Sequence, residues 1–271
     1  MTNIEKISSR GNQRLVATRK IRDGRGDRRI FIEGKRLAEE TLRSGIEILE
    51  CYFKIGFDDD DLLQTSIDKA KTTFELSEKL FDSIADTKNP QGLILIAKRP
   101  IGVQTAIEER IRTQNASPPV VLFLKEINNP SNLGAILRTA EAAGVAGVVV
   151  SKGSADVFSP KSLRASMGSA FRLPIWENAE TAEVVNWAKG LNFISTAADI
   201  SAAKSYTDID WSVPRLLVFG SEAHGLEAND LDQIDEKILI PMQNGVESLN
   251  LAVSAAVILF EAKRQNDLLR A

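Results

Sequence analysis

Short apolar runs alternate with amphipathic stretches along the C-terminal part of the chain. The apolar runs occupy residues 120–127, 146–151, 173–176, 192–196, 215–220 and 237–242. These runs are nearly continuous instead of alternating with polar residues, which is typical of strands buried on both faces. Residues 133–144, 182–190 and 249–265 lie between or after them and show helical patterning. This order predicts an α/β domain with a parallel sheet and helices on both faces.

The N-terminal part has a different pattern. Residues 36–45 predict a helix that ends at Gly45, and residues 51–55 and 92–98 predict strands. Between residues 99 and 119 the chain contains prolines, a glycine and a polar stretch, which is typical of a linker with room for a short helix. We therefore expect a small α/β domain over 1–98, a linker over 99–119 and a larger domain over 120–271.

In an open parallel sheet, ligands bind beyond the C-terminal ends of the strands, so the loops there are candidate sites. The first loop, NNPSN, precedes a helix with an apolar stripe. Ser131 or Asn132 is suited to cap that helix. Arg138 lies off the apolar stripe, and this position by itself favours a solvated arginine on a capped surface helix.

The second and third loops follow the strands at 215–220 and 237–242. In the second, Gly220 allows close backbone approach, while Glu222 and His224 are compatible with either chemistry or an exposed turn. In the third, Ser248 and Asn250 stand at the start of a helix that is apolar almost all round, and Ser248 is compatible with an ordinary cap. Such an apolar helix is buried in a core or in a subunit interface.

Composition excludes several classes of protein. The chain has 271 residues and a net charge of −3, and no apolar run is long enough to span a bilayer. The N-terminus has no apolar segment typical of a secretory signal, so we expect a cytoplasmic protein. With a single cysteine and a single histidine, the chain lacks the side chains of a cysteine-rich zinc site or a histidine cluster, so we expect no metal site. Gly-rich phosphate fingerprints and the G-x-S-x-G hydrolase pattern are absent.

The charge is unevenly distributed. Residues 1–43 carry 12 Lys and Arg against six Asp and Glu, whereas the whole chain is mildly acidic. A basic segment of this kind is compatible with an anionic partner such as nucleic acid, and equally with a solvated basic surface.

Three segments, NPSNLGAILRTA, FGSEAHGL and IPMQNGVESLNLAVSAA, stand in this order, each after a predicted strand. Together they resemble the SpoU/TrmH family of RNA 2′-O-ribose methyltransferases over about residues 120–262. RASMGSAFRLPI resembles the middle segment of that family. ISSRGNQRLVATRKIRD, FIEGKRLAEETL and NPQGLILIAK resemble its RNA-substrate-binding domain.

The resemblance implies a C-terminal trefoil knot, S-adenosyl-L-methionine as cofactor, an RNA substrate and a homodimer formed through the last helix. The cofactor-binding positions it implies are Gly220, Ile240, Met242 and Leu249. The catalytic positions it implies are Arg138, Asn132, Glu222, Ser248 and Asn250. Candidates for phosphate contacts in the basic segment are Arg10, Arg14, Arg19, Lys20, Arg28 and Arg29.

The reaction implied is methyl transfer to a ribose 2′-hydroxyl, with ribosomal RNA favoured over transfer RNA. A guanidinium normally stays protonated, so Arg138 as base and Arg138 as stabiliser of the alkoxide both stay open. The alternatives are a non-catalytic RNA-binding relic and a dinucleotide-dependent oxidoreductase. The complete polar set argues against the relic, and the missing phosphate fingerprint argues against the oxidoreductase.

Overall fold

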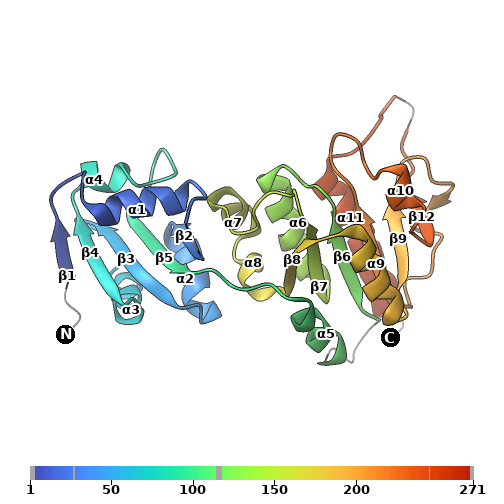
Figure 1. The fold of residues 1–271 in the computed structure, drawn as a ribbon, viewed down its shortest axis with the longest axis horizontal. Helices are drawn as coiled ribbons and strands as arrows, with labels where there is room; N and C mark the ends of the chain where they lie inside the picture. The colour runs from blue at the N-terminus through green and yellow to red at the C-terminus, as the bar shows by residue number, and fades with distance from the viewer. Residues whose placement is uncertain (1–3, 27, 114–117, 244, 269–271) are drawn as a thin grey trace. The chain divides into compact units, whose positions relative to one another are not determined.

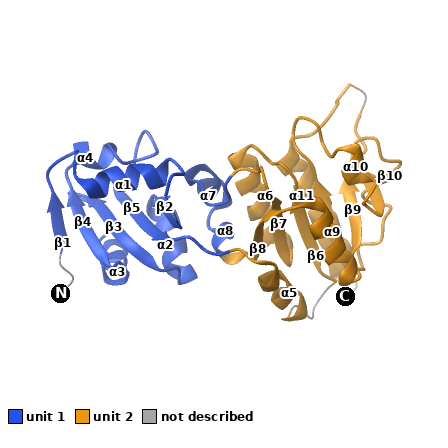
Figure 2. Ribbon diagram, in the orientation of Figure 1, with its two compact units in different colours: residues 1–101, 156–171 blue, residues 102–155, 172–271 orange. Residues whose placement is uncertain are grey.

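The structure is a computed structural model that describes residues 4–26, 28–113, 118–243 and 245–268. The chain divides into two compact units (Figure 2). The first contains residues 1–101 and 156–171, and the second contains residues 102–155 and 172–271.

The first unit contains a five-stranded mixed sheet in the order β1-β4-β3-β5-β2 (Figure 1). β5 runs antiparallel to both of its neighbours, and the other pairs are parallel. Its strands are β1 (Ile4–Ile7), β2 (Arg29–Glu33), β3 (Ile48–Lys54), β4 (Thr72–Leu76) and β5 (Leu93–Lys98). Its helices are α1 (Gln13–Arg22), α2 (Lys35–Ser44), α3 (Asp60–Lys69), α4 (Glu78–Asp82) and α7 (Pro160–Ser166). The short helix α8 (Ser169–Arg172) follows α7.

The second unit contains a seven-stranded sheet in the order β10-β12-β9-β11-β6-β7-β8, and every neighbouring pair is parallel. Its strands are β6 (Val120–Leu124), β7 (Gly147–Ser151), β8 (Ile175–Ala179), β9 (Ile194–Ala198), β10 (Lys204–Ser205), β11 (Arg215–Phe219) and β12 (Glu236–Leu239). Its helices are α5 (Gln104–Thr113), α6 (Pro130–Ala143), α9 (Thr181–Gly190), α10 (Ala228–Leu231) and α11 (Leu251–Leu268). The α/β fold with a parallel sheet is therefore confirmed.

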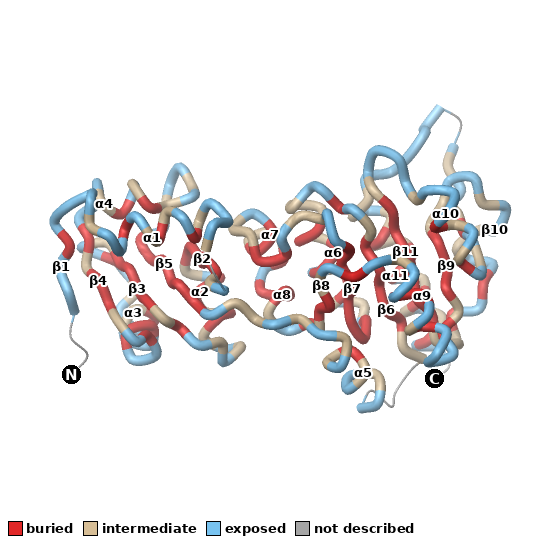
Figure 3. The backbone as a smooth tube through the Cα atoms, in the orientation of Figure 1, coloured by how far each residue is buried: buried red, intermediate tan, exposed pale blue. Residues whose placement is uncertain are grey.

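Helices cover both faces of this sheet, and the central strands are fully buried (Figure 3). Val121, Phe123 and Val218 pack on one face with Ile107 of α5 and Val184 of α9. Because side chains alternate along a strand, the intervening residues of β6 and β11 point to the opposite face. The paired helices α6 and α11 supply buried apolar residues on that side. This burial on both faces is why the strands are apolar throughout.

The boundaries of the units differ from those expected from the sequence. The expected linker contains α5, whose Ile107 is completely buried in the core of the second unit. A Cβ on Gly147 of β7 would lie 2.7 Å from Ile107 Cγ1, so the glycine admits the helix to the sheet. In addition, residues 156–171 belong to the first unit, where Arg164 pairs with Asp86 at 2.7 Å. Local patterning predicts helices and strands but carries no signal for either of these long-range contacts.

Candidate active site

The loops after four strands of the second unit meet at one edge of the sheet, because β12, β9, β11 and β6 are consecutive neighbours. They surround a cavity of about 700 Å³. Asn132 at the start of α6, residues 219–226 after β11 and residues in the range 238–251 after β12 line it. Such a volume is typical of small-molecule sites, which lie at roughly 300–1,000 Å³. Three loops far apart in the sequence are thus brought together, as expected.

A chain of polar contacts joins the three loops. The Asn250 side-chain amide donates to Asn132 Oδ1 at 3.2 Å, and Asn132 Nδ2 donates to Glu222 Oε1 at 3.2 Å. Asn250 Oδ1 meanwhile accepts the backbone N–H groups of Ala252 at 3.0 Å and Val253 at 3.3 Å, which caps α11. Each amide therefore has a defined orientation, and the start of α11 is connected to the carboxylate of Glu222.

The position of the helix caps explains why these asparagines are available. Pro130 is the first residue of α6, where its missing N–H is tolerated, and Asn129 caps the helix by accepting from the Ser131 N–H at 3.0 Å. The expectation that Ser131 or Asn132 caps α6 was wrong, because the helix starts earlier than its apolar stripe. Asn132 is consequently free to contact Glu222. Likewise Asn250 caps α11, whereas Ser248 lines the cavity.

Gly220 allows the backbone after β11 to fold closely upon itself. A Cβ at this position would lie 2.2 Å from both the carbonyl carbon and the oxygen of Gly225. Residues 221 and 225 exchange two backbone hydrogen bonds, at 3.0 and 2.9 Å, that close the loop. Ile240, Met242 and Leu249 line the same cavity, so the four residues expected to bind a cofactor share one site.

An ion pair behind the second loop attaches it to the sheet. Lys125, directly after β6, forms a hydrogen bond and ion pair through Nζ with Asp230 Oδ2 of α10. Asp230 Oδ2 also accepts the Glu227 N–H at 3.2 Å and so caps α10. Burial alone would lower the pKa of Lys125, but the hydrogen bond and charge of Asp230 hold that pKa above its ordinary value. The Lys125–Asp230 pair, which the sequence pattern does not reveal, secures the loop that carries Glu222.

Arg138 is placed differently from the other predicted catalytic residues. It lies on α6, is exposed, and does not line the cavity. Six residues along a helix rotate a side chain by about 240° and advance it by about 9 Å, which separates Arg138 from Asn132. Asn132, Glu222, Ser248 and Asn250 therefore share the cavity, while Arg138 lies on the neighbouring helix surface.

The loop after β9 is a part of the cavity that the sequence analysis did not include. Asp199 lines the cavity, and its Oδ1 accepts from the Ser201 N–H at 2.7 Å and the Ser201 hydroxyl at 2.8 Å. The rule that identified the other three loops, that ligands bind beyond the C-terminal ends of parallel strands, applies to the loop of Asp199 as well. His224 also lines the cavity and is exposed, and its backbone N–H donates to Ser221 Oγ at 3.2 Å.

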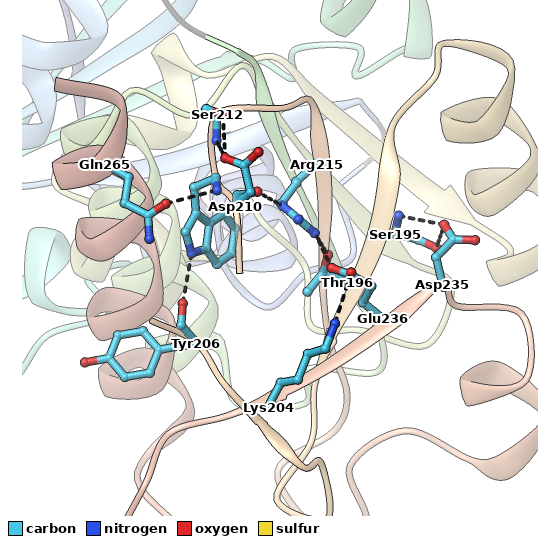
Figure 4. Close-up of polar contacts among 11 residues, drawn as sticks. Ser195, Thr196, Lys204, Tyr206, Asp210, Ser212, Arg215, Asp235, Glu236 and Gln265 are labelled. Atoms are coloured by element: carbon cyan, nitrogen blue, oxygen red, sulfur yellow. Dashed lines mark hydrogen bonds and ion pairs between the residues drawn. The ribbon is translucent and has the colours of Figure 1, made fainter. Parts of the chain in front are cut away.

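A buried polar cluster lies around the starts of β11 and β12 (Figure 4). Arg215 is 2% exposed and donates to Thr196 Oγ1 and to Glu236 Oε2, both at 2.7 Å. The Trp211 backbone N–H donates to Gln265 Oε1 of α11 at 3.1 Å, and the Trp211 indole N–H donates to the Tyr206 carbonyl at 3.0 Å. All of these polar groups are engaged with one another, so the cluster joins β9, β11, β12 and α11 and has a structural role.

The predicted RNA-contacting cations of the first unit fall into two groups. Arg14 pairs with the buried Glu50 at 2.9 Å, and Arg19 donates to the Arg10 carbonyl at 3.0 Å and to Ser83 Oγ. Lys20 and Arg29 form no side-chain hydrogen bond or ion pair within the described part of the chain, and the same holds for Arg28. The second group therefore has no side-chain charge partner among the described residues.

The described residues form neither a membrane span nor a metal-binding cluster. No helix in the described ranges is long and apolar enough to cross a membrane. Within those ranges, no cluster of three or more His, Cys, Asp or Glu side chains is arranged to hold a metal ion.

Comparison with known proteins identifies the class that this fold and site define. The SpoU rRNA Methylase family model matches residues 119–260, which include all three loops. The MRM3-like substrate binding domain model matches residues 13–95. Since the first match covers more than half of the chain, this protein belongs to the SpoU rRNA Methylase family.

Similar proteins are known from several organisms. The chain is 29% identical to the 23S rRNA (guanosine(2553)-2′-O)-methyltransferase RlmP of Bacillus subtilis, over 96% of this chain and 100% of the relative. It is 30% identical to the mitochondrial rRNA methyltransferase 3 of Mus musculus, over 93% of this chain and 70% of the relative.

Solved structures agree with these relatives. An AdoMet-bound rRNA methyltransferase from Sinorhizobium meliloti superposes with a TM-score of 0.82 at 26% identity, covering 96% of this chain and 98% of that one. An RNA 2′-O ribose methyltransferase superposes with a TM-score of 0.78 at 32% identity, covering 96% and 99%.

Proposed function

We propose that this protein transfers a methyl group from S-adenosyl-L-methionine to a ribose 2′-hydroxyl of ribosomal RNA. The observation that carries the proposal is the Asn250–Asn132–Glu222 contact chain at the edge of the cavity beside Gly220. The activities for which the relatives are named, rRNA 2′-O-methylation among them, support the same reaction.

The residues of the cavity fit the cofactor. Gly220 has no side chain at a position where a Cβ would collide with the Gly225 backbone. Ile240, Met242 and Leu249 give the cavity an apolar lining. Carboxylates of Asp199 and Glu222 line the cavity and suit a cationic ligand. When bound, S-adenosyl-L-methionine supplies an electrophilic methyl group on a sulfonium.

Arg138 acts on the RNA side of the site in this proposal. It is exposed and lies outside the cavity, so a substrate has access to it without displacing the cofactor. Its permanent positive charge stabilises the negative charge that develops on the 2′-oxygen, and the proton passes to a phosphate oxygen or water. Asn132 and Glu222 orient the groups between this side chain and the cavity.

The proposal includes a homodimer formed through α11 and a knotted C-terminal segment. Val253 and Phe260 are 48% and 49% exposed on α11, and they lie seven residues apart on one side of the helix. A second copy of the chain covering this apolar stripe would remove both side chains from water.

The knot is proposed from the family resemblance. The hydrogen bond from the Trp211 backbone to the Gln265 side chain supports a close association of α11 with the 199–214 segment.

The Arg138→Ala variant tests the proposal. We expect methyl transfer to ribosomal RNA to fall by about 10²–10³-fold, the usual effect of removing one charge-stabilising donor. Binding of S-adenosyl-L-methionine, measured by calorimetry, should be unchanged. Arg110→Ala removes another exposed arginine of the second unit and is the matched control. Near-normal transfer by Arg138→Ala contradicts the role of this residue, and absence of transfer by the unmodified protein supports the relic.

A further inference from the structure

One side of α1 in the first unit forms a groove of about 380 Å³, here called the α1 groove. Three of its lining residues are aliphatic, Val16, Ala17 and the buried Ile21, and are here called its floor. Three are cationic, Lys20, Arg25 and Arg29, and are here called its rim, and Gln13 completes the lining. The described residues that line it include no carboxylate.

The helix itself produces this surface. α1 buries Leu15, Thr18 and Ile21, and Leu15 and Ile21 belong to the apolar core of the unit. Val16 and Lys20, four residues apart, share another side of the helix, where Val16 is 37% exposed. The turn after α1 and the first residue of β2 bring two arginines to the same place.

The charges on the rim are not equally available. Arg25 pairs with Asp23 at 3.0 Å, and Arg22 pairs with the same carboxylate at 2.9 Å. The two arginines lower the pKa of Asp23, with the hydrogen bond from Arg22 as the largest cause. Lys20 and Arg29 have no carboxylate partner within the described ranges. Among the described residues, the α1 groove thus keeps two cations without a carboxylate partner, here called its free cations, beside an apolar floor.

We propose that the α1 groove binds an unpaired nucleotide of the RNA substrate. The base lies against the floor at Val16 and Ala17, and the flanking phosphates contact Lys20 and Arg29. Proteins bind single-stranded RNA with cations along the backbone and with flat aromatic or guanidinium groups against the bases. The α1 groove supplies the cations, and aliphatic side chains beside the Arg25 guanidinium form its base-facing surface. The groove lies within the match to a substrate binding domain, at residues 13–95. The inference rests on the proposed function, because it takes RNA to be the substrate.

Neutralisation of the two free cations tests the phosphate contacts. The full-length Lys20→Gln/Arg29→Gln variant is titrated with a fluorescent oligouridine by anisotropy at several salt concentrations. Each lost phosphate contact reduces the log–log salt slope for a single strand by about 0.7, so two contacts reduce it by about 1.4 and weaken binding roughly 25-fold at 0.1 M salt. Lys69→Gln/Lys79→Gln removes the same charge from exposed positions outside the groove and should retain affinity within about two-fold.

A substitution in the floor separates base binding from general attraction. Val16→Lys introduces a better helix former, adds a positive charge and fills the floor. If RNA is held by electrostatic attraction alone, this variant should bind RNA more tightly. If a base binds in the groove, the new lysine side chain blocks it and RNA binding should be at least about five-fold weaker. We expect the variants to fold, because none of the side chains of Val16, Lys20 and Arg29 is buried. Thermal melting checks that they do.

The inference is overturned if Lys20→Gln/Arg29→Gln matches its control, or if Val16→Lys binds oligouridine more tightly. It is also overturned if a hexaglutamate peptide competes as well as unlabelled oligouridine of similar charge. Thermal stabilisation by S-adenosyl-L-methionine and methyl transfer to ribosomal RNA are measured on the same variants. Normal methyl transfer with unchanged RNA affinity refutes only the groove, whereas absence of cofactor binding by the unmodified protein refutes the proposed function.

Discussion

Gly220→Ala directly tests how closely the loop after β11 is packed. The new Cβ would lie 2.2 Å from two backbone atoms of Gly225 and 2.5 Å from the Leu226 nitrogen. Carbon atoms pack at about 3.5–4.0 Å, so the loop backbone must retreat by more than about 1 Å. Backbone atoms cannot escape by a change of rotamer, and the two hydrogen bonds between residues 221 and 225 would be strained or lost. We therefore expect overpacking to reduce the free energy of unfolding by about 1–3 kcal/mol.

The same displacement alters the cavity. Residues 220–226 form one wall, so we expect the Kd for S-adenosyl-L-methionine to rise at least about ten-fold, or about 1.4 kcal/mol. Calorimetry measures cofactor affinity, and thermal melting with and without cofactor measures stability. Gly190→Ala is the control, since a Cβ there meets no atom within 4 Å.

Two outcomes would refute this reasoning. If Gly220→Ala melts like the unmodified protein, the loop accommodates a side chain and the steric argument is wrong. If stability falls while the Kd stays within about two-fold, Gly220 serves packing alone and the cofactor binds elsewhere. A ten-fold weaker affinity in Gly190→Ala would show that the assay responds to substitutions unrelated to the cavity.

The remaining predictions concern α11 and the single cysteine. Phe260→Glu should convert the proposed dimer to a folded monomer in analytical ultracentrifugation, because an unpaired charge in a dimer interface is strongly unfavourable, whereas Phe260 is 49% exposed within one chain. Ile55→Glu, at an exposed apolar position of the first unit, is the control and should leave the dimer unchanged. A Phe260→Glu variant that stays dimeric would contradict the interface. Burial raises the pKa of the Cys51 thiol to about 12 from its ordinary value near 9. The thiol should therefore resist iodoacetamide at pH 9 until the protein is unfolded by urea. Because the pKa of the Cys51 thiol is higher in the folded than in the unfolded protein, the contribution of this thiol to the free energy of unfolding is complete below pH 9 and falls as the pH rises toward 12. Cys51→Ala should lack that decline. Rapid alkylation of Cys51 in the native protein would show that the thiol is accessible and contradict its burial.

Much of the second unit was predictable from local pattern. Continuous apolar strands alternating with helices led to a parallel sheet, and the same pattern placed polar loops at the strand ends. Asn132, Glu222 and Asn250 were expected at one edge of the sheet, and the structure joins them by hydrogen bonds. This succeeded because strand and helix periodicity is a local property, and because parallel strands place their C-terminal ends at a common edge.

The tertiary structure decided which polar residues are free to act. Pro130 moved the cap of α6 to Asn129 and released Asn132, while Glu50 engaged Arg14. Lys20 has no side-chain partner among the described residues. Sequence pattern states the chemical type of each side chain but not its partner, which depends on the order of the strands and on contacts between distant segments. The sequence thus determined the class of fold and the residues available for chemistry. Packing alone determined which of them share the cavity, which are neutralised by a buried partner, and which remain on the surface to meet a ligand.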